Sequence, residues 1–463
     1  MAPMDTRFFL LASVCLTSFS SSFMSSSLNI AVDAISREFS VSPEHITYAI
    51  SAYVISVTAF LLPSSALANR LGYRRTYTMG AAAAACAAIA VVLSPTFWAL
   101  VAARAVQGCV NSVIFATATA VLSDNIEKDR RGAAIGLSVA SVYAGLTLSP
   151  SLGGVLTDTL GWRSMFLISA TLNLVAVAMS LHIKPDRPNT TYYPYFKMAV
   201  ACAGLMLFFY SIERLDTGPA MLAPLAAGAA LVAWYFALEQ RSKHPFMRIT
   251  LLWENPVLGC ALGASLCNYM ATFAIALLLS MHLQLLRGFS AMEAGLIMII
   301  EPGLQCLVSP FSGKLATRVS PNAIVTAGMS LSTAGTFVFS RLTASSPMEV
   351  LFLGQALCGI GFGLFSAPNT TIVMNSVDRS RFALVSALQS MTRNAGMSLC
   401  MALVSAVFAL TIAAPARSRQ YLEELQGSLG ISFLISTGLG IAGLCFCLRG
   451  LASSRRRAPG GQA

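Results

Sequence analysis

The chain has 463 residues, of which 56% are hydrophobic and only 11% are charged. Soluble proteins carry roughly a quarter charged residues, so this composition excludes a soluble globular protein and predicts a polytopic membrane protein. The net charge of +11 does not indicate a nucleic-acid partner, because the basic residues lie in alternate short loops instead of one patch. The 11 cysteines lack metal-ligand spacing, so we expect no metal site and no cofactor.

Fourteen apolar segments are long enough to cross a bilayer at about 20 residues per helix. The first follows Arg7 in the manner of a signal sequence, but no cleavage-like break ends it, so we expect an uncleaved span. The sequence therefore predicts an all-α integral membrane protein with spans near 8–32, 47–68, 75–95, 97–122, 132–157, 163–183, 195–213, 219–239, 256–283, 290–313, 321–341, 347–374, 382–413 and 430–449.

The distribution of basic residues predicts the orientation of these spans. With both termini in the cytoplasm, the inner loops and tails hold twenty Lys and Arg residues and the outer loops hold seven. That excess on one side follows the positive-inside rule. We therefore expect both termini on the cytoplasmic face of a plasma membrane, here a bacterial inner membrane.

The inner loop after the second span reads Ser-Ala-Leu-Ala-Asn-Arg-Leu-Gly-Tyr-Arg-Arg from Ser65 to Arg75. A basic tight turn that obeys the positive-inside rule would explain the last two arginines, but not the whole pattern. The pattern resembles the loop signature of the major facilitator superfamily, with serine at the usual glycine and asparagine at the usual aspartate. The resemblance implies a cytoplasmic latch, weakened by the lost aspartate, at Asn69, Arg70, Gly72 and Arg74.

Arg104 lies about seven residues inside the fourth span, or about 10 Å deep at a rise of about 1.5 Å per residue. A guanidinium at that depth costs several kcal/mol unless it is paired or hydrated, which makes it a candidate functional residue. The alternative is that its side chain extends to the outer surface. Arg104-Ala-Val-Gln-Gly108 also resembles the superfamily motif in which the arginine is tied to proton transfer.

The fifth span contains a pattern of small residues that allows close helix packing in lipid. Its proline removes a backbone hydrogen bond and can bend the helix. Packing without a special role is one interpretation of the glycines alone. The full spacing resembles the antiporter motif of the superfamily, with serine at one usual glycine, and implies a conformational hinge at Gly136, Gly145, Ser149, Pro150, Gly153 and Gly154.

Internal repeats indicate two halves. Arg104 to Gly108 is echoed by Gln355-Ala-Leu-Cys-Gly359, and the inner loop of the first half by residues 313–319. Two spans between the halves look inserted, which resembles the 14-span drug:proton antiporter branch of the superfamily. We expect six-helix bundles at 1–190 and 251–450, inserted helices at 191–250 and a basic tail at 451–463.

Glu301 falls near the middle of the tenth span, in the run Ile299-Ile-Glu-Pro-Gly303. An ionised carboxylate there is expensive, and desolvation favours its neutral, protonated form. A group that binds a proton when buried and releases it when wetted is what proton-coupled alternating access needs. The alternative is a structural carboxyl that stays protonated or hydrogen-bonded. We expect Glu301 to be the principal proton-binding group.

The first span departs from the branch. Met24 stands at the usual aspartate and Asp33 at the usual proline, so Asp33 is either a third proton-coupling residue or a solvated charge at the outer mouth. Other polar side chains in the spans could line a cavity, although each is more often a contact between helices. The candidates for a cavity are Asn29, Tyr143, Asn268, Tyr269, His282 and Arg393.

These features predict a secondary transporter, not an enzyme, that exports small lipophilic compounds or a metabolite in exchange for protons. We expect it to work as a monomer, with a small molecule, protons and the lipid bilayer as partners. No phosphate-binding glycine loop followed by Lys-Ser or Lys-Thr occurs, which argues against ATP as the energy source. The alternatives are an importer or uniporter on the same scaffold, a non-transporting receptor or assembly protein, and a membrane enzyme.

Overall fold

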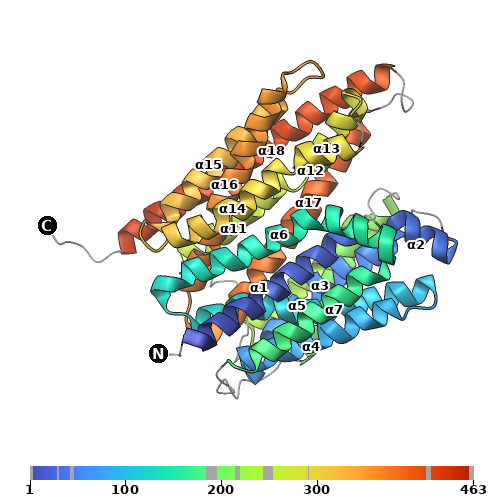
Figure 1. Ribbon diagram of the computed structural model, residues 1–463. Coiled ribbons are helices and arrows are strands. Elements are labelled where there is room, and N and C mark those ends of the chain that lie inside the picture. The colour runs from blue at the N-terminus through green and yellow to red at the C-terminus, as the bar shows by residue number, and fades with distance from the viewer. Residues whose placement is uncertain are drawn as a thin grey trace. The chain divides into compact units, whose positions relative to one another are not determined.

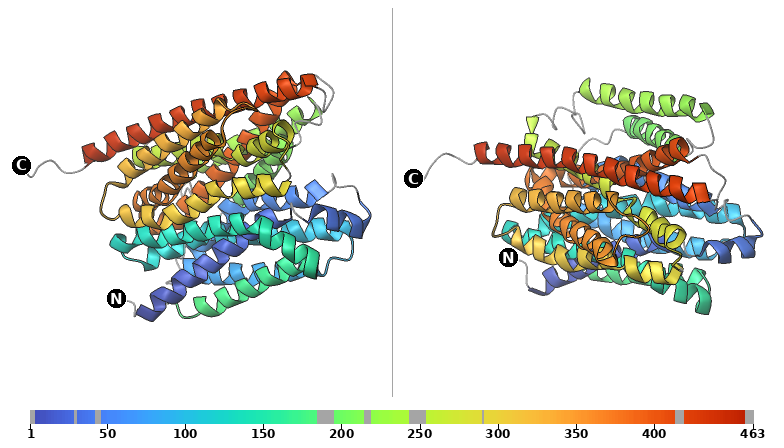
Figure 2. Two further views of the ribbon diagram at one scale, coloured as in Figure 1. Left: turned by 45° about the horizontal axis from the view of Figure 1, so that its top comes forward. Right: turned by 90° about the horizontal axis from the view of Figure 1, so that it is seen from above.

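The computed structural model describes residues 4–28, 31–41, 46–183, 195–213, 219–242, 254–289, 291–412 and 419–457, and within these ranges the chain forms helices without strands. Helices suit a bilayer because they pair their own backbone polar groups. Fourteen helical segments of the described chain are long and apolar enough to cross a membrane, which confirms the predicted number (Figures 1 and 2).

The helices group by their contacts into two units, and the first contains Met1–Leu251 and Val377–Met391. The predicted division into two bundles and an inserted pair follows the order of the spans and stays a prediction. The helices of unit 1 are α1 (Met4–Ser27), α2 (Val32–Phe39), α3 (Ile46–Leu71), α4 (Tyr73–Val92), α5 (Phe97–Asn125), α6 (Lys128–Leu160), α7 (Arg163–Ser180), α8 (Tyr195–Glu213), η3 (Pro219–Met221), α9 (Leu222–Gln240), η5 (Arg379–Arg381) and the start of α17 (Phe382–Thr411).

In unit 1, α1 packs along α6 and α7, while α5 packs against α3 and α4. Hydroxyl groups connect these apolar helices, and the buried Tyr77 hydroxyl lies 3.0 Å from the Ser13 hydroxyl and 2.9 Å from that of Thr17. The inserted helices α8 and α9 pack on each other, and α8 contacts α3. An ion pair with a 3.0 Å Nζ–Oε1 distance joins Lys197 of α8 to the buried Glu239 of α9.

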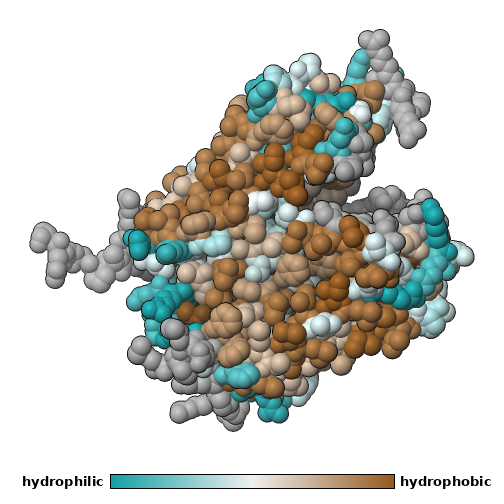
Figure 3. Space-filling model, viewed as in Figure 1, coloured by the Kyte–Doolittle hydropathy of each residue, from teal (hydrophilic) through white to brown (hydrophobic). Residues whose placement is uncertain are grey.

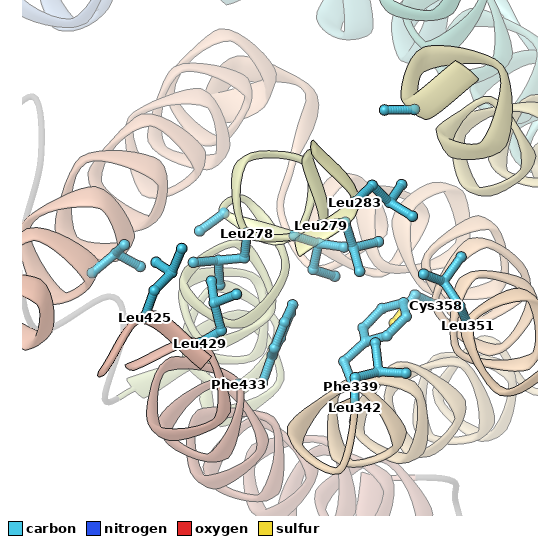
Figure 4. Packing of buried hydrophobic residues seen from close by; sticks show 14 of the residues in the cluster. Leu278, Leu279, Leu283, Phe339, Leu342, Leu351, Cys358, Leu425, Leu429 and Phe433 are labelled. Atoms are coloured by element: carbon cyan, nitrogen blue, oxygen red, sulfur yellow. The ribbon is translucent and has the colours of Figure 1, made fainter. Parts of the chain in front are cut away.

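Unit 2 contains Leu252–Ser376 and Thr392–Ala463. In it α16 packs against α14 and α15, and the long helix α18 packs against α11 and α15. Figure 4 shows the apolar cluster of this unit, in which Phe339 and Phe433 face each other with ring centroids 5.2 Å apart. Its helices are α11 (Pro256–Thr272), α12 (Ile275–Met281), the π-helical η4 (His282–Leu286), α13 (Ala291–Met298), α14 (Ile300–Leu315), α15 (Pro321–Ser340), α16 (Met348–Asn375), the rest of α17, and α18 (Arg419–Arg457).

Two predicted spans had the wrong ends. The first was expected to run to residue 32, but α1 ends at Ser27 and a separate short helix, α2, begins at Val32. The last was expected to begin at residue 430, but α18 begins at Arg419. Hydropathy missed the first turns of α18 because they are polar, with a 2.9 Å hydrogen bond from Gln420 to Glu424 one turn later.

The surface of the helices agrees with a membrane environment. On the face in Figure 3, hydrophobic residues cover the middle of the helices and hydrophilic residues gather toward their ends. Large apolar side chains such as Leu152, Val155 and Phe311 are exposed on the helices. Exposed apolar surface on this scale is unfavourable in water and is expected in contact with lipid.

The helix α2 is clamped by a polar network at the end of unit 1 that we expect to face outward. Arg163 donates to Glu38 at 2.5 Å and to the Val92 carbonyl at 2.8 Å, and the Trp162 indole donates to Glu38 at 2.7 Å. Partial burial alone would raise the pKa of Glu38, but the hydrogen bonds from Arg163 and Trp162 outweigh it and hold the pKa below its ordinary value.

Gly145 gives the first testable prediction, because it lets α6 lie against the backbone of α1. A methyl group added at Gly145 would lie 2.6 Å from the Phe19 carbonyl oxygen, so one helix must move. We expect Gly145→Ala to destabilise the detergent-solubilised protein by about 1–3 kcal/mol, measured as a lowered midpoint of thermal unfolding. The matched control is Gly295→Ala, where an added methyl group meets no atom within 4 Å. Equal stability of the two variants would contradict the prediction.

Glu38 gives a prediction about pH. A carboxylate whose pKa is depressed by folding stabilises the protein above its unfolded-state pKa and loses that effect as the pH falls through the folded-state value. The Glu38→Gln variant mimics the protonated state at every pH. We expect wild type to be more heat-stable than this variant near neutral pH, by under about 1 kcal/mol because the pair is partly exposed. The difference should vanish on acidification below about pH 3; a difference that persisted there would contradict the assignment.

Candidate functional site

Arg104 is buried inside unit 1, with 0% of its surface exposed, so its side chain does not reach outward. Its Nη1 donates to Gln107 Oε1 at 2.6 Å, and its Nε lies 3.4 Å from the Ala49 carbonyl oxygen. The guanidinium carbon lies 4.2 Å from the centre of the Tyr53 ring. Its Nη2 has no hydrogen-bond partner among the described residues. Neutral dipoles and an aromatic face thus take the place of water around this charge.

The packing of α5 on α3 builds this environment. Gly108 is one turn after Arg104, and a methyl group there would clash with the Tyr53 carbonyl oxygen, so only glycine allows the two helices to approach so closely. Asn111, a further turn along, donates to the Tyr53 hydroxyl at 3.0 Å and fixes that ring. Within the described residues, no carboxylate forms a salt bridge with Arg104.

Glu301 lies in unit 2 at a break between two helices. The helix is interrupted at Ile299 because Pro302 has no amide proton to donate to the preceding turn. The Glu301 side chain is partly exposed, and its Oε1 accepts from Gln305 Nε2 at 3.2 Å. No lysine or arginine of the described chain forms a salt bridge with it. The carboxyl group can therefore exchange a proton without first breaking an ion pair.

The proposed hinge residues lie on α6, which continues as one helix through Pro150. Gly145 packs against α1 between Phe19 and Phe23, and Ser149 donates to the Phe23 carbonyl oxygen at 3.1 Å. The serine that replaces the usual glycine thus makes a second contact with the same helix. Gly136 and Gly153 are buried, while the surroundings of Pro150 and Gly154 are outside the described residues.

Side-chain hydrogen bonds of the predicted latch residues run to neighbouring helices. Arg70 donates to the Tyr195 hydroxyl of α8 at 2.9 Å, and Arg74 donates to the Leu181 carbonyl at the end of α7. Asn69 Oδ1 is buried and has no hydrogen-bond partner among the described residues, and Gly72 adopts a φ of 93° that favours glycine. Each arginine therefore caps or holds a different neighbouring helix.

The sequence analysis missed an ion pair in this region. Arg379 donates to Asp124 Oδ2 at 2.7 Å, and the Tyr73 hydroxyl donates to the Arg379 carbonyl oxygen. These contacts hold η5, which directly precedes α17, on α4 and α5, although most of α17 belongs to unit 2. Tyr73 lies within the loop signature, but nothing in the spacing of the sequence connects Asp124 to a residue 255 positions later.

The remaining candidates that the structure describes lie on several helices of the two units. Asn29 and the side chain of Asp33 lie outside the described residues. Asn268 donates to the Met329 sulfur at 3.4 Å, and Tyr269 packs edge-on against Phe362. His282 accepts from Arg287 Nε at 3.1 Å. Tyr143 is buried in α6 and Arg393 is partly buried in α17.

Over the described residues, no group of three or more His, Cys, Asp or Glu side chains could hold a metal ion. Arg104 in unit 1 and Glu301 in unit 2 are ionisable residues inside membrane-spanning segments, and each forms a hydrogen bond with a neutral glutamine. Ionisable residues at such positions mark ion or substrate pathways.

Comparisons with known proteins agree with this picture. The chain is 26% identical over 448 residues to the riboflavin transporter RibZ of Clostridioides difficile, which covers 95% of this chain and 97% of the relative. It is 28% identical over 406 residues to the multidrug resistance protein Stp of Mycobacterium tuberculosis, with 84% of this chain and 73% of the relative covered. A third relative is the tetracenomycin C resistance and export protein of Streptomyces glaucescens, 26% identical over 391 residues.

Solved structures show the same fold. The human organic anion transporter MFSD10 matches with a TM-score of 0.65 at 15% identity, over 95% of this chain and all of that chain. The proton:xylose symporter XylE matches with a TM-score of 0.66 at 13% identity, over 95% and 94%. The family model of the Major Facilitator Superfamily matches residues 14–401. The chain therefore belongs to the major facilitator superfamily, as its motifs predict, and is a multi-pass membrane transporter and not an enzyme.

Proposed function

We propose that this transporter exports small lipophilic compounds or a metabolite in exchange for protons, by alternating access in a bacterial plasma membrane with both termini in the cytoplasm. The observation that carries the proposal is the Glu301 carboxyl group, which lies at a helix break in a membrane-spanning segment, with the amide of Gln305 as its hydrogen-bond partner among the described residues. A carboxyl group in that position can be protonated when dry and deprotonated when water reaches it.

The buried cation of unit 1 supports the same proposal. Arg104 keeps its charge close to neutral dipoles, with one guanidinium nitrogen unpaired among the described residues. A transporter needs such a charge to interact with a substrate or proton carrier that is present in only part of the cycle. We propose that Arg104 and Glu301 handle the proton, and that the glycines of α6 act as the hinge.

The names of the relatives point to two substrate classes for this site. One relative is named for a single vitamin and others for multidrug resistance. The antiporter pattern on α6 supports export over import for either class. Transport by a monomer is also part of the proposal.

Proton release from inside-out vesicles tests the mechanism. We expect at least one compound from a panel of cationic, neutral and anionic substances to discharge a preformed proton gradient with wild type. Glu301→Gln should reduce this release at least tenfold, because the amide carries no exchangeable acid proton. Glu349→Gln, at an exposed acid in the first turn of α16, is the matched control and should behave as wild type.

Three outcomes separate the alternatives. Discharge by wild type and Glu349→Gln alone supports proton antiport through Glu301. Equal discharge by all three proteins would remove Glu301 from the mechanism. If no protein discharges the gradient while labelled compounds still equilibrate across the membrane, the protein is a uniporter.

We further propose that the ion pair between Asp124 and Arg379, with the loop signature, forms the cytoplasmic latch. Asp124 has a side chain only 3% exposed, whereas that of Arg379 is 71% exposed, so solvent weakens the pair. We expect Asp124→Asn to cost about 1 kcal/mol, which corresponds to roughly fivefold faster hydrogen exchange of the backbone amides of residues 379–391. Exchange at wild-type rates in this segment would contradict the latch. Glu127→Gln, which breaks the exposed pair with Arg7, is the control.

A further inference from the structure

Gln355 of α16 is an unusual buried residue. Its side chain is 0% exposed, and neither its amide oxygen nor its amide nitrogen has a hydrogen-bond partner in the described chain. Burying an amide whose donor and acceptor are both unpaired is unfavourable. A polar side chain with this cost is expected to find its partner in another state of the protein.

The register of α16 against α14 shows which element Gln355 faces. A methyl group at Gly359 would lie 2.7 Å from the Glu301 carbonyl oxygen, and one at Gly363 would lie 2.8 Å from Val308 Cβ. A move of one turn forward on α16, from Gly359 to Gly363, moves the contact forward on α14 from Glu301 to Val308. The two helices therefore run parallel. Gln355 is one turn before Gly359 and shares its face. By contrast, Cys358 faces α15, where its thiol contacts the Ser332 carbonyl.

The same register puts Gln355 about one turn before the level of the Glu301 backbone, on the face of α16 that packs on α14. Side chains on a helix lean toward its N-terminus, so the Glu301 side chain leans from the level of Gly359 toward the turn that carries Gln355. In this structure the carboxyl group is bonded to Gln305 of its own helix at 3.2 Å. A change of side-chain rotamer would exchange one amide partner for the other.

We propose that Gln355 is a positioning residue that binds the protonated carboxyl group of Glu301. The carboxyl O–H donates to the amide oxygen of Gln355, and the Gln355 amide nitrogen donates to the carboxyl C=O, so that both orphaned atoms are satisfied and no covalent bond changes. An ionised carboxylate has no proton to donate and leaves the amide oxygen facing a negative charge. The pair therefore selects the protonated form. This inference rests on the proposed role of Glu301 as the proton-binding group.

Other ionisable groups near this pair are few. Cys358 on α16 and Cys306 on α14 are the titratable neighbours within about a turn of Gln355 and Glu301 along the two helices. Glu293 on α13 and Glu349 on α16 are exposed at the first turns of their helices, about 12 Å and 9 Å away along the helix axes at a rise of about 1.5 Å per residue. α11, which also packs on α16, carries no Asp, Glu, Lys, Arg or His.

Infrared difference spectroscopy of the full-length protein in lipid vesicles tests the pair. The probe is the carboxylic C=O band that is present in wild type and absent in Glu301→Gln. In Gln355→Leu we expect the pH midpoint of this band to fall by about one unit, a tenfold loss of proton affinity, and its frequency to rise because a hydrogen bond is lost. Gln355→Met serves as a second apolar variant if Gln355→Leu does not fold.

Gln305→Leu is the matched control and should act with the opposite sign. Its amide nitrogen donates to Glu301 in this structure, and such a donor favours the ionised form. Removing it should raise the midpoint, whereas removing Gln355 should lower it. A band that is unmoved in Gln355→Leu and Gln355→Met would overturn the pair but leave Glu301 as a proton-binding group. If no Glu301-dependent band appears at any pH, both the pair and the proposed function are wrong.

Discussion

The guanidinium of Arg104 must be solvated without water, and the architecture of unit 1 follows from that requirement. An isolated charge in a helix centre is costly, and here its neighbours are an amide, a backbone carbonyl and the face of Tyr53. The Tyr53 ring can lie against the guanidinium because Gly108 allows α5 to pack closely on α3 and because Asn111 donates to the Tyr53 hydroxyl. One charged side chain thus explains a close helix contact and the polar residues on three successive turns of α5.

Unit 2 places its intramembrane ionisable group among different residues. The position that echoes Arg104 holds the neutral Gln355, and the ionisable group is instead Glu301 on the neighbouring helix. A neutral amide in the neighbouring helix leaves the carboxyl group able to bind a proton, whereas an arginine in its place would hold the carboxylate ionised in an ion pair. The difference between the halves therefore suits a cycle in which one unit keeps a permanent charge and the other gains and loses a proton.

Much of this arrangement could be predicted from the sequence, because a bilayer imposes simple rules. The length of the apolar segments predicted the spans, and the position of an ionisable residue inside a span predicted Arg104 and Glu301 as candidates. Contacts between distant positions could not be predicted in this way. The pair of Asp124 and Arg379 depends on how α17 packs on unit 1, and the isolation of Gln355 depends on which neighbours surround it. Hydropathy also cannot detect a helix end within a run of apolar and small residues, as at Ser27.

The departures from the family motifs have physical explanations in the packing. Met24, at the position where the branch usually has an aspartate, is fully buried in an apolar cluster with Leu28 and Phe166, where a carboxylate would be destabilising. Ser149 adds a hydrogen bond to the backbone of α1. With an apolar core residue at the usual position of the first-span acid, we assign proton binding to unit 2. Glu301 lies there at a helix break, where the amide of Gln305 donates to its carboxyl group.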